Sequence, residues 1–452
     1  MKTVILFYLK LFIVLFLLIY ITEVNAGDWT NSGCNAQRNG ITNEYGPTGE
    51  DILWSGGRTS LIAWLPVTEG SRVFMVRQAN WPGSINDSLI VAMDLISGGE
   101  LWTYEIPYNP GDWTIWIAGV KNGQVYASRS GNGASVSAKL YALSVEDGSV
   151  IWISDDDIDA GPYDGVVFTS NGDPVIASFR DIWRINSLDG STVWHNTRTG
   201  SVSGECGGAI YGNAFYVADT VSGGQSIIRY DLNSGAKMYQ SPVMSGFLSQ
   251  TTPFVGPDGT VYYNRAQGNP LTDFYYAFTD TGTEFIEKWH IPSITGGGGE
   301  FGIGTDGSVY LVIPGPELVR VDPVTGIVIN SYLLPNYDKA HIAVDTSGNI
   351  YFSNGDFAGG YLYAFDAELH ELWSVPVTNI NIGGPSLGES GIMVVCGIGT
   401  DVRAYQSIYP TPTPTATPGM EVPVISTTSF AYLFFIIGIL IWLFTINLKY
   451  KH

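Results

Sequence analysis

The densest group of side chains able to bind a metal is the acidic run DDDID at residues 155–159. Asp155, Asp157 and Asp159 stand at alternate positions, as carboxylate ligands do in calcium-binding loops. The match then fails, because the expected glycine comes one residue late and the twelfth position is Val166 instead of glutamate. Charge runs are common on solvated loops. We therefore predict a solvent-exposed acidic loop, with these three carboxylates as the candidates for a metal site.

Two short motifs have the spacing of catalytic signatures. Residues 384–388 read G-x-S-x-G, which would make Ser386 a hydrolase nucleophile, and residues 297–302 read G-x-G-x-x-G, which would bind a phosphate. Both chemistries require a helix directly after the motif. A strand pattern follows in each case, so we predict no catalytic residue here.

Three further polar residues stand at the start of strands that we expect to be innermost. They are Glu205 in GECGG, Glu300 in GGGGEFGIG and His341 in KAHIAVD. Such positions face a central channel or its mouth, where carboxylates can bind a cation or a polar ligand. Polar residues that hold buried water are the commoner arrangement.

The element that must position all these residues is a repeated strand–turn–strand unit. It first occurs as AMDLISGGELW, Ala92 to Trp102, and returns about every 41 to 50 residues. A second hairpin precedes each copy, for example FVGPDGTVYY from Phe254. Two hairpins per period predict four-stranded antiparallel propeller blades, since one hairpin buries too little surface to fold alone. The residues that we assign to structural roles in the repeat are Trp54, Gly98, Trp102, Gly148, Trp152, Gly190, Trp194, Gly235, Tyr239, Gly326 and Trp373.

The two ends of the array predict how the ring closes. The last period begins at Ser386 and stops at Ser407, one strand short. An isolated strand, DILW, ends at Trp54, one period before Trp102. We therefore expect the N-terminal strand to complete the last blade, which removes exposed sheet edges. The prediction is an all-β, eight-bladed propeller with one additional C-terminal transmembrane helix.

The motif A-x-D-x-x-x-G-x-x-x-W resembles the tryptophan-docking repeat of the eight-bladed propellers similar to pyrroloquinoline-quinone (PQQ) enzymes. Ala92, Asp94, Gly98 and Trp102 match it fully, and the resemblance covers residues 27–408. That family contains quinone-dependent dehydrogenases as well as inert scaffolds. The resemblance implies that an enzyme member would hold PQQ over the ring centre with calcium, a catalytic aspartate and often a disulfide between adjacent cysteines. This chain has no adjacent cysteines and no c-type haem motif.

Cysteine is sparse, with only Cys34, Cys206 and Cys396. Cys34 precedes the strand that closes the last blade, and Cys396 lies within that blade. A Cys34–Cys396 disulfide would lock the ring, and we give it as a hypothesis.

The lead-in segment, residues 27–50, is rich in Gly, Asn and Thr, and we predict that it caps one end of the ring.

The termini predict export and membrane attachment. Residues 1–26 read as a signal peptide, with an uncleaved anchor as the alternative. Residues 27–408 form the propeller, 409–428 a Pro/Thr-rich stalk, 429–448 a transmembrane helix and 449–452 a basic cytoplasmic tail. This topology places the propeller outside the cell or in the periplasm, on a single-pass membrane protein. The same C-terminal pattern also resembles signals that sortase-like enzymes process.

The charge composition makes some classes of binding partner less favourable than others. The formal net charge is -21 and the isoelectric point is about 4.4, which disfavours nucleic acid because phosphates require Lys and Arg. We predict a non-catalytic scaffold without a cofactor, which binds a protein or surface polysaccharide. The alternative is a PQQ-dependent dehydrogenase with calcium. A third hypothesis is a glycan-active or glycan-binding propeller, and only the aromatic content of the sequence supports it.

Overall fold

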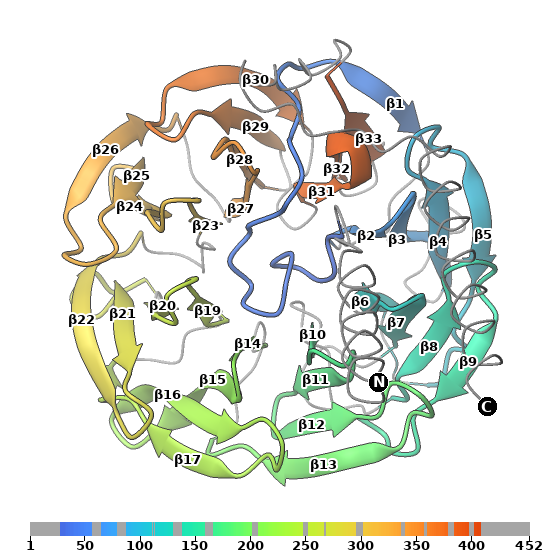
Figure 1. Ribbon diagram of the computed structural model, residues 1–452, viewed down its shortest axis with the longest axis horizontal. Helices are drawn as coiled ribbons and strands as arrows, with labels where there is room; N and C mark the ends of the chain where they lie inside the picture. Colours follow the sequence, from blue (N-terminus) through green and yellow to red (C-terminus); the bar gives the residue numbers. More distant parts are fainter. Residues whose placement is uncertain are drawn as a thin grey trace, which may run out of the picture. The chain divides into compact units, whose positions relative to one another are not determined.

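Eight antiparallel sheets surround a central channel in the computed structural model, and each sheet contains a path of four strands (Figure 1). The predicted eight-bladed β-propeller is therefore confirmed. We number the blades I to VIII in chain order. The structure describes residues 28–407 except 57–64, 79–86, 111, 113, 130–137, 159–165, 201–206, 247–251, 266–267, 295–301, 336–339, 357–358, 378–383 and 397–401.

In blades I to IV the strands run from the channel outward in chain order, so the second hairpin of each period lies at the rim. Blade IV has one additional short strand beside its third strand. Their strands are β2 (Val67–Glu69), β3 (Arg72–Gln78), β4 (Ser88–Asp94) and β5 (Glu100–Tyr104); β6 (Trp116–Lys121), β7 (Gln124–Ser128), β8 (Tyr141–Ser144) and β9 (Val150–Ile153); β10 (Val167–Phe168), β11 (Pro174–Ala177), β12 (Asp181–Ile185) and β13 (Thr192–Thr197); and β14 (Gly208–Tyr211), β15 (Ala214–Val221), β16 (Gly224–Asp231), β17 (Lys237–Gln240) and β18 (Met244–Ser245).

Blades V to VII repeat this order, whereas blade VIII takes its outer strand from the other end of the chain. A single turn of 3-10 helix, η2 (Glu389–Gly391), lies in blade VIII. The strands are β19 (Phe254–Val255), β20 (Val261–Arg265), β21 (Phe274–Asp280) and β22 (Phe285–Pro292); β23 (Gly302–Ile303), β24 (Val309–Ile313), β25 (Glu317–Val321) and β26 (Val328–Leu333); β27 (Ala340–Val344), β28 (Ile350–Asp356), β29 (Gly359–Phe365) and β30 (Glu371–Val377); and β31 (Ser386–Gly388), β32 (Ile392–Val395), β33 (Val402–Tyr405) and β1 (Ile52–Gly56).

The first residue of the repeat motif faces its tryptophan across the ladder. In blade I Ala92 pairs with Trp102, and the register then shifts at a bulge between Ala92 and Met93. Ala142 and Trp152 repeat this pairing in blade II. The bulge increases the local twist of the outer hairpin. The corresponding pairs are Arg184–Trp194, Arg229–Tyr239, Ala277–Trp289, Arg320–Asn330 and Ala364–Trp373.

The docking tryptophans other than Trp373 pack on the outer turn of the following blade. Trp102 donates its indole N–H to the carbonyl oxygen of Val145 at 3.0 Å. A Cβ on Gly148 would lie 2.6 Å from the Trp102 ring, and the φ of Gly148 is +70°. Only glycine meets both conditions at low cost. The same contact joins Trp54 to Gly98, Trp152 to Gly190, Trp194 to Gly235 and Trp289 to Gly326.

Two blade boundaries use polar groups where the others use an indole. Between blades IV and V, the Tyr239 hydroxyl donates to the carboxylate of Asp280, and Arg229 pairs with Asp280 at 3.0 Å. Between blades VI and VII, Asn330 donates its side-chain amide to the Glu368 carbonyl oxygen at 2.8 Å. The docking position therefore varies in chemistry around the ring.

Ring closure follows the predicted route. β1 pairs antiparallel with β33, with Trp54 opposite Ala404 and Ser55 opposite Arg403.

Within the described part of the chain, no helix is long and apolar enough to cross a bilayer. Residues 429–448, where we predict the membrane span, lie outside the described residues, as does the signal peptide.

Candidate functional site at the channel mouth

The centre of one channel mouth is occupied by the lead-in segment Asp28–Glu44, which we call the plug (Figure 1). Trp29 and Thr68 exchange backbone hydrogen bonds at 3.1 and 3.0 Å, which joins the plug to blade I. The Glu44 carboxylate accepts the N–H of Gly391 in blade VIII at 3.2 Å. Backbone N–H groups of five inner strands donate to plug carbonyl oxygens at 2.7 to 3.1 Å: Val120 to Thr30, Ile210 to Ala36, Val255 to Gln37, Ile303 to Asn39 and Val344 to Gly40.

Side-chain amides also hold the plug in shape. Asn35 donates from Nδ2 to Oδ1 of Asn39 at 2.8 Å, and Asn39 donates to the Val255 carbonyl oxygen at 3.2 Å. Gly40 has a φ of +72°, and a Cβ there would lie 2.6 Å from the Ile342 carbonyl oxygen. The predicted cap across one end of the ring is thus present as a closely bound element.

A buried arginine fixes the plug to blade IV. Arg38 is 1% exposed and donates from Nε to the Gly208 carbonyl oxygen at 2.8 Å. Its Nη1 donates to the hydroxyl of Ser32. A guanidinium this deeply buried is stable only when hydrogen-bonded. These contacts therefore help to keep the plug in one position.

Three charged side chains lie at the edge of the plug beside blades I and II: Asp28 of the plug itself, Glu69 and Lys121. Asp28 accepts the N–H of Gly70 at 3.0 Å, and Glu69 accepts the N–H of Gly123 at 2.8 Å. Burial raises the pKa of both carboxyl groups above their ordinary values, and nearby Lys121 acts in the opposite direction. The two carboxylates also repel one another. Both carboxyl groups at this edge of the mouth therefore bind a proton more readily than an exposed carboxyl group does.

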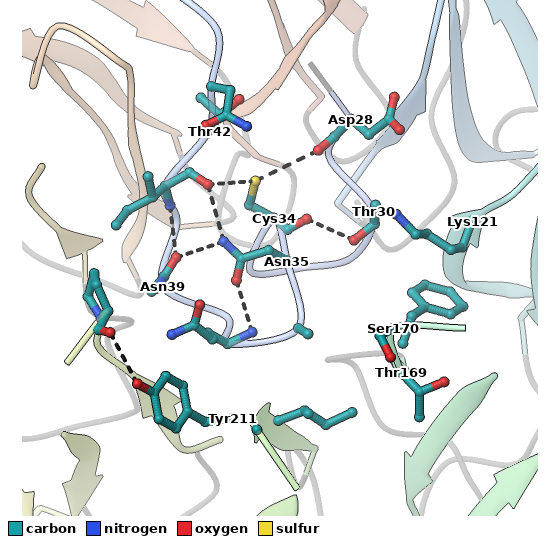
Figure 2. Close-up of a pocket in the computed structure, with 18 of the residues that line it drawn as sticks. Asp28, Thr30, Cys34, Asn35, Asn39, Thr42, Lys121, Thr169, Ser170 and Tyr211 are labelled. Atoms are coloured by element: carbon teal, nitrogen blue, oxygen red, sulfur yellow. Dashed lines mark hydrogen bonds between the residues drawn. The ribbon is translucent and has the colours of Figure 1, made fainter. Parts of the chain in front are cut away.

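A hollow of about 880 Å³ lies between the plug and the inner turns of blades II to V (Figure 2). Lys121, Ser170 and Tyr211 line its blade side, and the Tyr211 hydroxyl donates to the Pro257 carbonyl oxygen at 3.4 Å. On the plug side, Asn35 and other amides are already hydrogen-bonded within the plug or to blade V. Within the residues that the structure describes, the hollow gathers no nucleophile–base pair.

The acidic run is held by local contacts. Lys139 pairs with Asp157 at 3.0 Å and donates to the Asp155 carbonyl oxygen at 2.7 Å. Asp156 accepts the Thr192 hydroxyl at 2.6 Å. Asp159 lies outside the described residues. Among those that are described, no three His, Cys, Asp or Glu side chains converge as a metal site would require.

The other sequence candidates are dispersed. Glu205 and Glu300 lie outside the described residues, and His341 lies in β27 with its side chain likewise not described. Ser386 is fully buried in β31 and donates to the Pro66 carbonyl oxygen at 2.7 Å. It is therefore a structural residue of an inner strand, and G-x-S-x-G here is no nucleophile elbow.

The predicted Cys34–Cys396 disulfide is wrong. Cys34 is a buried free thiol in the plug, and its Sγ donates to the Ile41 carbonyl oxygen at 3.1 Å. It packs in a cluster with Val395, whereas Cys396 packs in a different cluster towards blade I. Successive strand side chains point to opposite faces, so Cys396 faces away from Cys34. Cys206 lies outside the described residues.

The docked blades and the closed ring define an eight-bladed propeller of the PQQ-like class. The family model described as outer membrane protein assembly factor BamB matches residues 86–332, more than half of the chain. The chain belongs to this family. No curated protein sequence matches it significantly.

Solved structures share the fold at low sequence identity. BamB from Moraxella catarrhalis is 12% identical with a TM-score of 0.58, over 79% of this chain and 99% of that one. Quinohemoprotein alcohol dehydrogenase from Comamonas testosteroni is 13% identical with a TM-score of 0.59, over 87% and 83%. The dehydrogenase ADHIIG from Pseudomonas putida HK5 is 12% identical with a TM-score of 0.57, over 88% and 84%. At such identities the likeness extends to the fold alone.

Proposed function

We propose that this protein is a non-catalytic scaffold that binds a protein or polysaccharide partner outside the cytoplasm, attached to the membrane through its C-terminal segment. The observation that carries the proposal is the plug. It fills the centre of one mouth and hydrogen-bonds with inner strands on most sides of the ring. A ligand bound in the centre of this mouth would have to displace those bonds.

The described residues at this mouth do not fit a quinone with calcium. Buried Arg38 and the amide-bonded plug occupy the centre. The carboxylates of Asp28 and Glu69 each accept a backbone N–H, and no group of three His, Cys, Asp or Glu residues among the described residues could hold a metal ion. We therefore derive no redox step here. The acidic surface supports a partner with basic or neutral chemistry, because like charges repel at an interface.

The test is to incubate the full-length chain with PQQ and calcium, then measure bound quinone by absorbance and dye-linked oxidation of primary alcohols. We expect neither stoichiometric quinone binding nor turnover, in a sample that circular dichroism shows to be folded. Quinone-dependent turnover would overturn the scaffold proposal and favour the dehydrogenase.

A further inference from the structure

Among the described residues, the outer hairpin of blade VI carries a group of five exposed aliphatic side chains at the rim. Val324 and Leu333 are each 67% exposed, and Ile327 is 65% exposed. Val328 and Ile329, in the first half of β26, are also exposed. We call these five residues the blade VI patch. Groups of exposed apolar side chains are commonly interaction sites.

β26 also has an open backbone edge. Among the described strands it is the outermost of its sheet and pairs with β25 alone. Natural proteins usually protect such edges with charge or proline, as Glu100 does in β5 and Lys237 in β17. By contrast, the residues from Pro323 to Tyr337 include no charged side chain. The edge is therefore chemically able to accept another strand.

The position of the docking tryptophan is altered at this same blade. Asn330 takes that position, and its amide donates to the Glu368 carbonyl oxygen. Tyr332 bonds through its hydroxyl to Glu371. These two side chains hold β26 against blade VII, while Ile329 and Leu333 remain exposed. The strand is thus fixed in place with its apolar face open.

Acidic residues border the patch. Glu317 lies directly opposite Leu333, and Asp322 begins the turn into β26. Two cations act at this border among the described residues. Arg320 is paired with Asp306 and Glu368, and Lys288 acts electrostatically on Asp322. Carboxylates therefore outnumber cations. A second copy of this acidic chain would bring the same charges together, whereas a basic partner would complement them. The bordering carboxylates are those of Asp306, Glu317, Asp322, Glu368 and Glu371.

We propose that β26 binds an extended segment of a protein partner by strand addition, and that this segment has alternating apolar residues flanked by Lys or Arg. This inference rests on the proposed scaffold function and specifies its partner. Backbone hydrogen bonds to β26 supply affinity, and alternate side chains of the added strand pack on the blade VI patch.

The test uses a fluorescent peptide of alternating valine and threonine with two lysines at each end, titrated into the full-length chain. Ile329→Lys is expected to weaken binding at least tenfold. Leu101→Lys on β5 is the matched control, because Leu101 and Ile329 are 48% and 47% exposed, and it should change binding less than twofold. A peptide with glutamates at its ends should bind at least tenfold more weakly than the lysine peptide.

Hydrogen exchange locates the bound peptide independently. The outward backbone amides of β26 should become protected on binding, while those of β5 should not. Absence of binding, or equal effects of the two lysine variants, would overturn the strand-addition proposal. Self-association that Ile329→Lys abolishes would overturn it in favour of a second copy. Each of these results leaves the quinone assay unaffected, so failure here is distinguishable from failure of the scaffold function.

Discussion

Trp373 donates its indole N–H to the carbonyl oxygen of Pro47 at 3.3 Å. Elsewhere the docking indole bonds to the outer turn of the next blade. Blade VIII has no such turn, because β33 and β1 come from opposite ends of the chain. Pro47 replaces the missing turn and also accepts the Tyr351 hydroxyl at 3.1 Å. The N-terminal segment therefore supplies a strand, a docking surface and the plug.

Cross-linking the closure should stabilise the ring more than cross-linking a single hairpin. Ser55→Cys with Arg403→Cys joins facing residues of β1 and β33. The loop-entropy model predicts a gain of about 6 kcal/mol for this pair, because it closes a very long loop. Asp181→Cys with Thr197→Cys, facing residues within blade III, should gain about 3 kcal/mol. Urea unfolding of the oxidised and reduced forms measures both gains. Failure of the Ser55–Arg403 cysteine pair to oxidise in the folded protein would contradict closure of the ring by β1.

The docking glycines should be intolerant of a methyl group. Gly148→Ala adds a Cβ 2.6 Å from Trp102 at a φ of +70°, and should cost about 3 kcal/mol from strain and overpacking together. Gly123→Ala is the matched control, because its φ is +77° and nothing lies within 4 Å of its added Cβ. It should cost only about 1 kcal/mol. Chemical denaturation compares the two, and similar losses would exclude the indole contact as the cause.

A fully buried ion pair joins blades III and IV. Arg198 Nε lies 2.7 Å from Oδ1 of Asp219, and both side chains are 0% exposed. Asp219→Asn leaves the guanidinium buried without its charge partner, which should cost about 3 to 5 kcal/mol. The partly exposed pair of Arg77 and Glu100, also 2.7 Å apart, provides the comparison. Glu100→Gln should cost less than about 1 kcal/mol. The free energies of unfolding would contradict this reasoning if the two losses were equal.

Glu69 should make stability depend on pH. Burial raises its pKa above the ordinary value of 4.5, so its stabilising contribution is present below that value. The contribution is lost as the pH rises through the raised pKa. Relative to the wild type, Glu69→Gln should therefore gain stability between pH 4 and neutral pH. Denaturation midpoints across this range measure the gain.

Asp94→Asn should give a pH dependence of the opposite sign. Hydrogen bonds from Ser97 lower the pKa of Asp94 below 3.8, so this carboxylate stabilises the fold above that value. Its contribution is lost as the pH falls through the lowered pKa. The deficit of the variant should thus shrink on acidification. The difference in stability between variant and wild type should therefore change with pH in opposite directions for Glu69→Gln and Asp94→Asn. A change in the same direction would show that at least one of the two pKa assignments is wrong.

The periodic part of the fold was predictable because packing repeats in the sequence. Trp102 and Gly148 stand at fixed offsets since an indole from one blade must meet a turn of the next. The isolated Trp54 likewise indicated ring closure, because it had no blade of its own. Tyr239 with Asp280 was not predictable as a docking pair, since a tyrosine at that position does not specify its partner.

The candidate site was less predictable, because the plug has no period. Its contacts join residues such as Arg38 and Gly208, which lie far apart in the sequence. The disulfide prediction failed because the sequence places Cys396 near the ring closure but does not decide to which face of blade VIII its side chain points. The sequence pattern VIN at residues 328–330 did mark blade VI as an altered repeat, since asparagine stands where tryptophan normally ends the motif.

The most direct test of the account is hydrogen exchange of the amides that bond to the plug. Val120, Val255 and Val344 donate to plug carbonyl oxygens, and should exchange only through global unfolding. Gly40→Val, which places side-chain atoms against the Ile342 carbonyl oxygen, should accelerate their exchange. If these amides exchange in the wild type much faster than the core strands do, the plug opens in the native state. The mouth would then be an accessible ligand chamber, and the plug would no longer support a non-catalytic scaffold.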